Sequence, residues 1–181
     1  MENYKEIEPI NYKVHLNIDL NEDEFDGSVV VELEVKSERK EIILHIDELD
    51  IHNCYLLQDD SQIECDFEDN QEEKELTIQL PEKLRESIVL KLEFKGKYHD
   101  DLLGMYKSEY EYEGKKECMI STQFEEIYAR RVFPCIDHPS KKAIFDIELV
   151  INNDLMGISN TAIKETKRLE NGKKLVSFKP T

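Results

Sequence analysis

The chain has 181 residues, a hydrophobic fraction of 39% and a charged fraction of 36%, enough apolar surface for one globular domain without disulfide or metal staples. Its formal net charge is −17, which argues against nucleic-acid binding and against an anionic membrane surface, because both depend on Lys and Arg side chains. Glycine and proline are scarce, so we expect no disordered or low-complexity tail and a single soluble domain over residues 1–181.

The first third of the chain alternates between apolar and polar residues. Residues 12–20 place an apolar side chain at every second position, and residues 29–35 repeat this pattern. The polar stretch 21–27 between them is rich in Asn, Asp and Gly, which is typical of a turn. The pattern predicts two amphipathic strands joined as an antiparallel hairpin.

Further segments with strand character recur at short spacing along the rest of the chain. They are 41–46, 50–57, 75–80, 88–98, 118–122, 143–151, 158–162 and 174–178. The stretches 66–73 and 169–173 between them are turn-like. Many short strands without long helical patterns predict an all-β, mainly antiparallel sandwich or barrel-like domain, with no internal repeat and no linker that would divide it.

Residues 124–140 interrupt the strand pattern. Glu125–Arg131 could form about two turns of helix, which would end near Phe133 because the residue before Pro134 is driven out of the helical region. A compact irregular segment inside a β domain is where we expect a site to lie.

The chain contains no complete catalytic motif. Its five histidines include no pair four residues apart on a helix, and there is no GxSxG elbow, phosphate-binding loop or dinucleotide fingerprint. The acidic residues 59–69 lack the spacing of a calcium loop and are expected to form a solvated loop. The four cysteines form no CxxC pair, and no apolar run is long enough to span a membrane, so we expect reduced, mostly buried thiols and a cytoplasmic location.

One ordered series of motifs is more specific than anything above. It begins with Leu102-Leu103-Gly104-Met105-Tyr106-Lys107-Ser108 and Tyr110, continues with Thr122-Gln123-Phe124-Glu125, Ala129-Arg130-Arg131 and Phe133-Pro134-Cys135-Ile136-Asp137-His138-Pro139, and ends with Lys142-Ala143 and the strand 145–149. The series resembles the amino-terminal domain of the M1 family of zinc aminopeptidases, especially the microbial members related to tricorn-interacting factors. The resemblance extends from about residue 12 to residue 178.

The resemblance implies a saddle-like β-sandwich that covers the active site of a larger enzyme and contributes two substrate-binding residues to it. Matched position by position, these are Glu125, which would bind the α-ammonium group of a peptide, and Gln123, which would line the pocket for the first side chain. Arg130, Arg131 and Asp137 would form an internal ion-pair frame. The zinc, its ligands and the catalytic base would belong to a catalytic domain that is missing here, so this chain would hold no metal and be inactive alone.

The resemblance also implies that the chain stops before the last strand of its domain, so that it exposes the face that packs on the catalytic domain and tends to self-associate. His138 and Tyr128 depart from the family pattern, where Glu and Asp are common, which affects local pairing next to the site.

Two alternatives remain open at this stage. The chain could be a free-standing β-sandwich module that binds peptide or carbohydrate, or a regulatory homologue without catalysis. Individual residues also have simpler explanations: Glu125 could be a carboxylate favoured at the start of a helix, Gln123 could make an edge-strand hydrogen bond, and Cys135 is expected to be a buried apolar filler.

Overall fold

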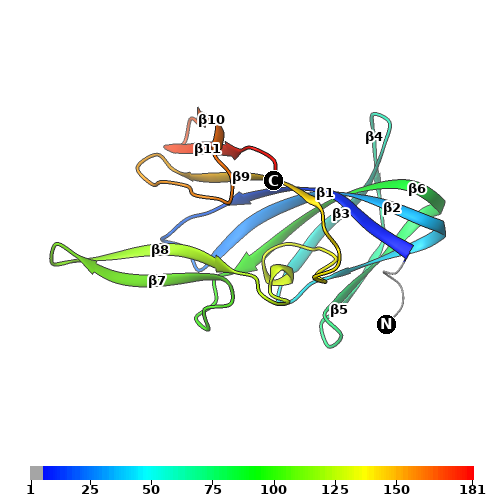
Figure 1. The fold of residues 1–181 in the computed structure, drawn as a ribbon, viewed down its shortest axis with the longest axis horizontal. Coiled ribbons are helices and arrows are strands. Elements are labelled where there is room, and N and C mark those ends of the chain that lie inside the picture. The colour runs from blue at the N-terminus through cyan, green and yellow to red at the C-terminus, as the bar shows by residue number, and fades with distance from the viewer. Residues whose placement is uncertain (1–5) are drawn as a thin grey trace.

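The computed structural model describes residues 6–181, and most of them lie in strands (Figure 1). The elements in chain order are β1 (Ile7–Asn17), β2 (Glu24–His45), β3 (Asp50–Gln58), β4 (Ser61–Glu64), β5 (Phe67–Asn70), β6 (Glu75–Lys97), β7 (Gly104–Tyr112), β8 (Lys115–Gln123), the 3₁₀ turn η2 (Ala129–Arg131), β9 (Ile144–Asn152), β10 (Ile163–Arg168) and β11 (Lys173–Phe178). The all-β fold class expected from the alternating pattern is therefore confirmed.

The strands form one large mixed sheet and one separate hairpin. The large sheet has the order β10-β11-β9-β1-β2-β6-β3-β4, and β5 pairs with β6 outside this path. Neighbours are antiparallel except β1 and β9, which run parallel. Strands β7 and β8 pair only with each other, and Figure 1 shows their hairpin extending away from the body of the sheet.

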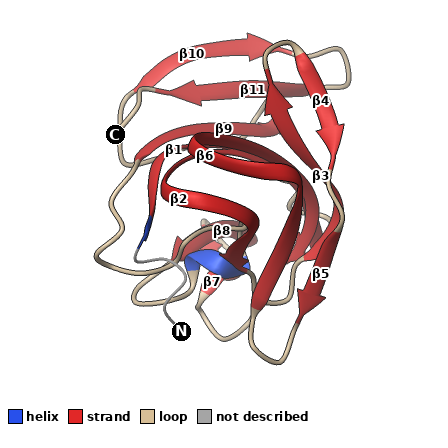
Figure 2. Ribbon diagram, turned by 90° about the vertical axis from the view of Figure 1, so that its right-hand side faces the viewer, coloured by secondary structure: helices blue, strands red, loops and turns tan. Residues whose placement is uncertain are grey.

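Strands β2 and β6 are longer than expected because each joins two of the segments predicted from the sequence. The expected hairpin is confirmed, with Tyr12 opposite Val31 in the β1–β2 ladder, but β2 then continues through residues 41–45. The β2–β6 ladder shifts register on both sides of Arg39, and such an irregularity bends a strand without ending it. The sheet consequently curls around its own apolar face (Figure 2).

Three local predictions were wrong. Residues 66–73, expected to be a turn, contain the short strand β5, whose four residues pair with β6. Residues 158–162 are not a strand, because the pairing with β11 begins only at Ile163. Residues 125–131 form a turn followed by η2 instead of the two helical turns expected there.

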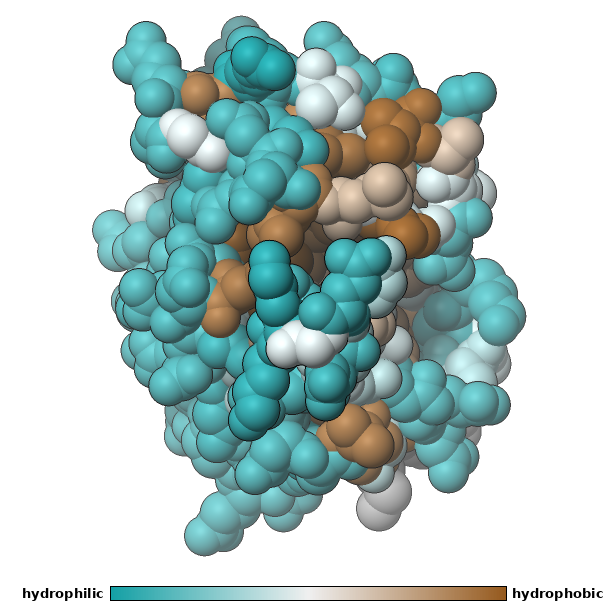
Figure 3. All heavy atoms as spheres, turned by 90° about the vertical axis from the view of Figure 1, so that its left-hand side faces the viewer, coloured by the Kyte–Doolittle hydropathy of each residue, from teal (hydrophilic) through white to brown (hydrophobic). Residues whose placement is uncertain are grey.

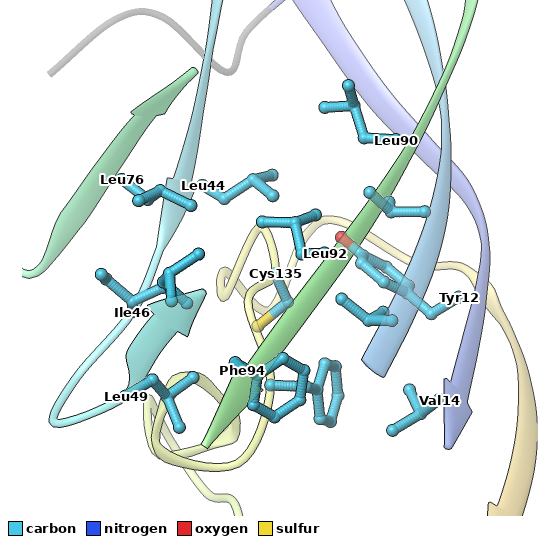
Figure 4. Close-up of a cluster of buried hydrophobic side chains, with 14 of the residues drawn as sticks. Tyr12, Val14, Leu44, Ile46, Leu49, Leu76, Leu90, Leu92, Phe94 and Cys135 are labelled. Atoms are coloured by element: carbon cyan, nitrogen blue, oxygen red, sulfur yellow. The ribbon is translucent and has the colours of Figure 1, made fainter. Parts of the chain in front are cut away.

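The concave side of the sheet encloses the core. Alternate residues of β2 and β6 are fully buried there, as the period-two pattern predicted, and Figure 4 shows Leu90, Leu92 and Phe94 of β6 pointing into this cluster. Burial of each large side chain stabilises the fold by about 1.5–3 kcal/mol. Cys135 also lies in the cluster, so the irregular segment 124–143 packs on the core through buried side chains of its own.

Candidate functional site

The β7–β8 hairpin carries Gln123 at its base, opposite Gly104. One face of the hairpin is turned toward the body: Met105 is buried, and Lys107 Nζ donates to Asp23 Oδ1 at 3.1 Å and lies 5.0 Å from the ring centre of Tyr98. Because neighbouring residues of a strand point to opposite faces, Gln123 lies on the other face, where its side chain is exposed.

Gly104 is required where the hairpin meets the irregular segment. Its φ of +69° is in the region that favours glycine, and a Cβ built on it would lie 2.8 Å from Arg131 Cβ. The base of the hairpin therefore packs directly against Arg131, which fixes the position of Gln123 relative to η2.

Residues 124–128 form the turn that carries Glu125. The ring of Phe124 packs against Phe133 at a centroid distance of 6.1 Å, and Tyr128 N donates to Phe124 O at 3.0 Å. The Glu125–Glu126 peptide bond is cis, and both carboxylates are exposed. Glu125 thus lies in a short exposed turn whose first and last residues, Phe124 and Tyr128, are joined by a backbone hydrogen bond.

Arg130 and Asp137 form a shielded ion pair across the segment. Arg130 Nε donates to Asp137 Oδ2 at 3.0 Å, its backbone N donates to the same oxygen at 3.2 Å, and Arg130 Nη2 donates to Asp137 O at 3.0 Å. Both side chains are about nine-tenths buried. Because Arg130 N bonds to a side chain seven residues away, it is not available to continue an α-helix, which explains why only one 3₁₀ turn forms.

Arg131 binds two carboxylates from other parts of the chain. Its Nε donates to Asp47 Oδ2 at 3.0 Å and its Nη1 donates to Asp101 Oδ2 at 2.8 Å, while its guanidinium lies 5.2 Å from the ring centre of Tyr128. Burial would raise the pKa of Asp47, but hydrogen bonds from Arg131 and Lys74 outweigh it and hold that pKa below its ordinary value. The pKa of Asp101 is lowered mainly by its hydrogen bond from Arg131.

The backbone of residues 135–137 is tied to β1 and to the end of β2. Cys135 and His45 exchange backbone hydrogen bonds of 2.7 and 3.2 Å, Ile136 N donates to Tyr12 Oη at 3.0 Å, and Asp137 N donates to His45 Nδ1 at 2.9 Å. Burial, followed by the nearby charge of Arg130, lowers the pKa of His45 to about 4. The neutral imidazole is therefore the form that accepts the bond from Asp137 N.

Glu125 and Gln123 make none of these contacts. Within residues 6–181 neither side chain forms a hydrogen bond or ion pair, whereas every charged neighbour from Arg130 to Asp137 does. An exposed carboxylate next to a fixed segment can bind a cation, and an exposed amide can both donate and accept hydrogen bonds. The geometry thus leaves two adjacent polar groups available for a ligand.

The described residues contain no group of three or more His, Cys, Asp or Glu side chains placed to hold a metal ion. An open hollow of about 410 Å³ lies on the polar face of the large sheet, lined among others by His15, Ser28, His52 and Glu93. None of the site residues expected from the sequence lines it. In residues 6–181 no helix has the length and apolar character needed to cross a membrane.

The motif predicted that Arg130, Arg131 and Asp137 form ion pairs, but it did not indicate which other residues of the chain bind them. Asp47 and His45 sit at the end of a predicted strand, and Asp101 precedes the Leu102–Ser108 motif, so each lay next to a recognised pattern. No local signal connects Asp101 with Arg131, 30 residues later, or Asp47 and His45 with residues more than 80 positions later. Only the fold, which brings the end of β2 beside η2, reveals the pairing.

Comparisons with known proteins identify the family of the chain. A family model described as the peptidase M1 N-terminal domain matches residues 8–181. The chain is 34% identical over 176 residues to a puromycin-sensitive aminopeptidase of Caenorhabditis elegans and 35% identical over 179 residues to aminopeptidase M1 of Arabidopsis thaliana, in each case over 94% of this chain. It is 31% identical over 146 residues to an aminopeptidase N of Lactococcus lactis subsp. cremoris, over 81% of this chain.

These relatives are much longer than the chain. The matched region is 19%, 20% and 16% of the three proteins, so the chain spans about a fifth of the length of the relatives that it matches. They come from an animal, a plant and a bacterium, so the narrower similarity to microbial members expected from the motifs is not borne out.

Proposed function

The chain belongs to the peptidase M1 N-terminal domain family, and from this membership we propose that it is the amino-terminal domain of a zinc-dependent aminopeptidase. In this proposal the complete protein removes residues from the amino termini of peptides. The domain contributes binding and orientation of the substrate, and the zinc ligands and the general base are supplied by residues outside this chain.

The observation that carries the proposal is the free carboxylate of Glu125 beside a segment in which the other charges are paired. An exopeptidase must distinguish a free α-ammonium group from an internal amide, and a carboxylate does so through charge. Hydrogen bonds in which one partner is ionised are roughly twice as strong as neutral ones. Since Glu125 makes no internal ion pair among residues 6–181, its charge is available to a peptide amino terminus.

Gln123 has a related role in the proposal. It precedes Glu125 by two residues, and its side chain is exposed on the hairpin face opposite to that of the buried Met105. Gln123 ends β8 and Glu125 lies in the turn that follows directly, so the two exposed side chains are separated by one residue, Phe124, whose ring packs on Phe133. Gln123 would therefore contact the first side chain of the peptide while Glu125 binds its ammonium group.

The frame residues would act by holding the turn in place. Arg130 and Asp137 fix η2 to the segment that follows it, and Arg131 fixes η2 to Asp47 and to the loop before β7. Both anchors lie within a few residues of Glu125. A ligand-binding group held in this way loses little conformational entropy when the ligand binds.

The test is the Glu125→Gln substitution in the complete protein that contains this domain. Losing one partner of a desolvated charge pair typically costs ~2–5 kcal/mol, so we expect kcat/KM for an aminoacyl substrate to fall by about 30-fold to several thousandfold. The Glu126→Gln variant is the matched control, because Glu126 is also an exposed carboxylate in the same turn. Unchanged kcat/KM in Glu125→Gln, or an equal loss in both variants, would contradict the role of Glu125 as the amine anchor.

A second part of the proposal concerns how the domain meets the rest of the enzyme. Figure 3 shows hydrophobic side chains gathered above the tip of the β7–β8 hairpin, on the side of the β9–β10 connection. In that connection the side chains of Met156 and Ile158 are 82% and 80% exposed, and the adjoining Leu149 and Leu155 are only partly buried. We expect this surface to pack against the catalytic domain, since large exposed apolar patches are uncommon on monomeric proteins.

The isolated chain should therefore self-associate through the same surface. Sedimentation velocity over a range of concentrations is expected to show a rising weight-average mass, and the Met156→Lys, Ile158→Lys double variant is expected to remain monomeric. An ideal monomer at high concentration for the unmodified chain would contradict this part of the proposal.

A further inference from the structure

Two buried cysteines face each other at one edge of the large sheet. Strands β3 and β4 pair in antiparallel register, with Leu56 opposite Ile63 and Tyr55 opposite Glu64. One step further the ladder places Cys54 opposite Cys65, and Cys65 N donates to Cys54 O at 2.9 Å. Residues directly opposite in an antiparallel pair have Cα atoms about 4.5–5.5 Å apart, a separation that disulfides also adopt.

The two side chains point to the same side of the sheet. Cys54 shares the inward face of β3 with Leu56, and the exposed fractions of Cys54 and Cys65 are 0% and 3%. Burial, and then the charge that its neighbour Cys65 would carry, raise the pKa of the Cys54 thiol to about 12. The pairing geometry thus turns two buried thiols toward the same side of neighbouring strands.

Strand β4 gives solvent a route to this pair. It has four residues, pairs only with β3 at the end of the sheet order, and has no fully buried side chain. Short edge strands open at low free energy compared with the core of a sheet. When β4 separates from β3, Cys65 at its end becomes accessible, whereas Cys54 remains held through the pairing of β3 with β6.

From this geometry we infer that Cys54 and Cys65 form a reversible dithiol–disulfide site that reacts with small-molecule disulfides. The Cys65 thiol loses its proton to solvent, and the thiolate attacks one sulfur of the small disulfide, forming a mixed disulfide and releasing one thiolate. Cys54 then loses its proton and attacks Cys65 Sγ, releasing the second thiolate. Overall, two protein thiols are oxidised to one disulfide and one small disulfide is reduced to two thiols. The two protons that the cysteines lose are taken up by the two released thiolates.

Burial sets the rate of this reaction and distinguishes the pair from the other cysteines. Since the thiolate is the nucleophile, raised thiol pKa values slow the reaction of the closed strand pair and make opening of β4 the slow step. Cys118 on β8 and Cys135 in the irregular segment lie on other elements, away from this edge of the sheet. The disulfide would close residues 54–65 into a loop and lock β4 onto β3.

The experiment uses the reduced 181-residue chain in an excess of glutathione disulfide at about pH 8, where a thiol of ordinary pKa is partly ionised. Samples are quenched with acid, alkylated after denaturation and weighed by mass spectrometry. We expect the number of alkylated cysteines to fall from four to two. Residues 54–65 contain no Lys or Arg, so trypsin leaves both cysteines on one peptide, whereas cleavage before Asp59 or Asp60 yields two fragments joined only through the disulfide.

Two variants and a parallel measurement complete the test. Cys118→Ser is expected to retain the link, Cys65→Ala to lose it, and the oxidised chain to unfold at a higher temperature than the reduced chain. In a parallel sample the folded, reduced chain is treated with an alkylating reagent, and the time course of Cys65 alkylation reports when this thiol becomes accessible. A link involving Cys118 or Cys135, no link after Cys65 has become accessible, or a Cys65 that never reacts would each overturn the inference.

Discussion

The irregular segment contains two adjacent regions that are held in different ways. Residues 129–137, the anchored region, are fixed by ion pairs and by hydrogen bonds to the sheet, including those of Arg130 with Asp137 and of His45 with the backbone of Cys135 and Asp137. Residues 123–127, the exposed region, are connected to the protein by the pairing of Gln123 with Gly104, by the ring of Phe124 and by the bond from Tyr128 N to Phe124 O. The side chains of Glu125 and Gln123 lie in the exposed region and form no hydrogen bond or ion pair among residues 6–181.

The difference between the two regions separates stability from binding. A charged group that is fully paired inside the fold stabilises it but has nothing left for a ligand, whereas an unpaired exposed group adds little to stability and can bind. The anchored region should therefore respond to substitution through unfolding free energy. The exposed region should respond through activity alone.

The largest effect is expected at Asp137. In an Asp137→Ala variant, Arg130 keeps its charge in a site that is about nine-tenths buried and loses its carboxylate partner. Breaking a buried pair from one side typically costs ~3–5 kcal/mol, so the free energy of unfolding in urea should fall by about that amount.

Asp146→Ala is a suitable control for this variant. Asp146 also accepts a hydrogen bond across the chain, from Asn11 at 2.9 Å, but it lies on the polar face of β9 and forms no ion pair with any residue from 6 to 181. We expect a loss of about 1 kcal/mol there. Equal losses in the two variants would show that the anchored region is not a specially stabilising feature.

A smaller effect is expected from acidification, through His45. The folded protein holds the pKa of His45 at about 4, whereas in the unfolded chain the side chain titrates near its ordinary value of 6.5. Between these values the unfolded state binds a proton that the folded state does not, so stability is fully present above about pH 6.5 and is lost as the pH falls toward 4. A shift of this size corresponds to about 3 kcal/mol.

Urea unfolding at a series of pH values tests this prediction. His52→Gln is expected to keep the pH dependence, because His52 is exposed, while His45→Gln should flatten it between pH 4 and 6.5. The lowered pKa of Asp47 adds a loss of stability with the same sign, but at pH values below about 4. A slope unaffected by His45→Gln would show that protonation of His45 does not weaken the anchored region.

The regular parts of the fold were predictable from the sequence because burial on one face of a sheet leaves a period-two pattern. This pattern gave the β1–β2 hairpin, with Val29, Val31 and Leu33 inside. It could not show that β2 and β6 continue through bulges, because the polar residues 36–40 look like a turn. Strand β7 was not predicted either, since only Gly104 and Met105 of its nine residues are buried and the rest therefore show little hydrophobic periodicity.

The site was predictable only in part, and for a different reason. Its residues came from a motif, and the motif contains Gln123, Glu125, Arg130, Arg131 and Asp137 but not their distant partners. The helix expected over Glu125–Arg131 failed because Arg130 N and Arg130 O bond to Asp137 and Asp47 rather than to residues within a helix. Local propensity is overridden wherever backbone groups find tertiary partners in this way.

The smallest effect is expected at Glu125, and it is the sharpest test of the division between the two regions. Because its carboxylate has no hydrogen bond or ion pair within residues 6–181, Glu125→Gln should change the free energy of unfolding of the isolated chain by less than about 0.5 kcal/mol. The same substitution in the complete protein is expected to reduce kcat/KM by at least about 30-fold. A loss of stability comparable to that of Asp137→Ala would place Glu125 in the anchored region after all, and the fall in activity would then follow from a disturbed fold rather than from a missing contact with the substrate.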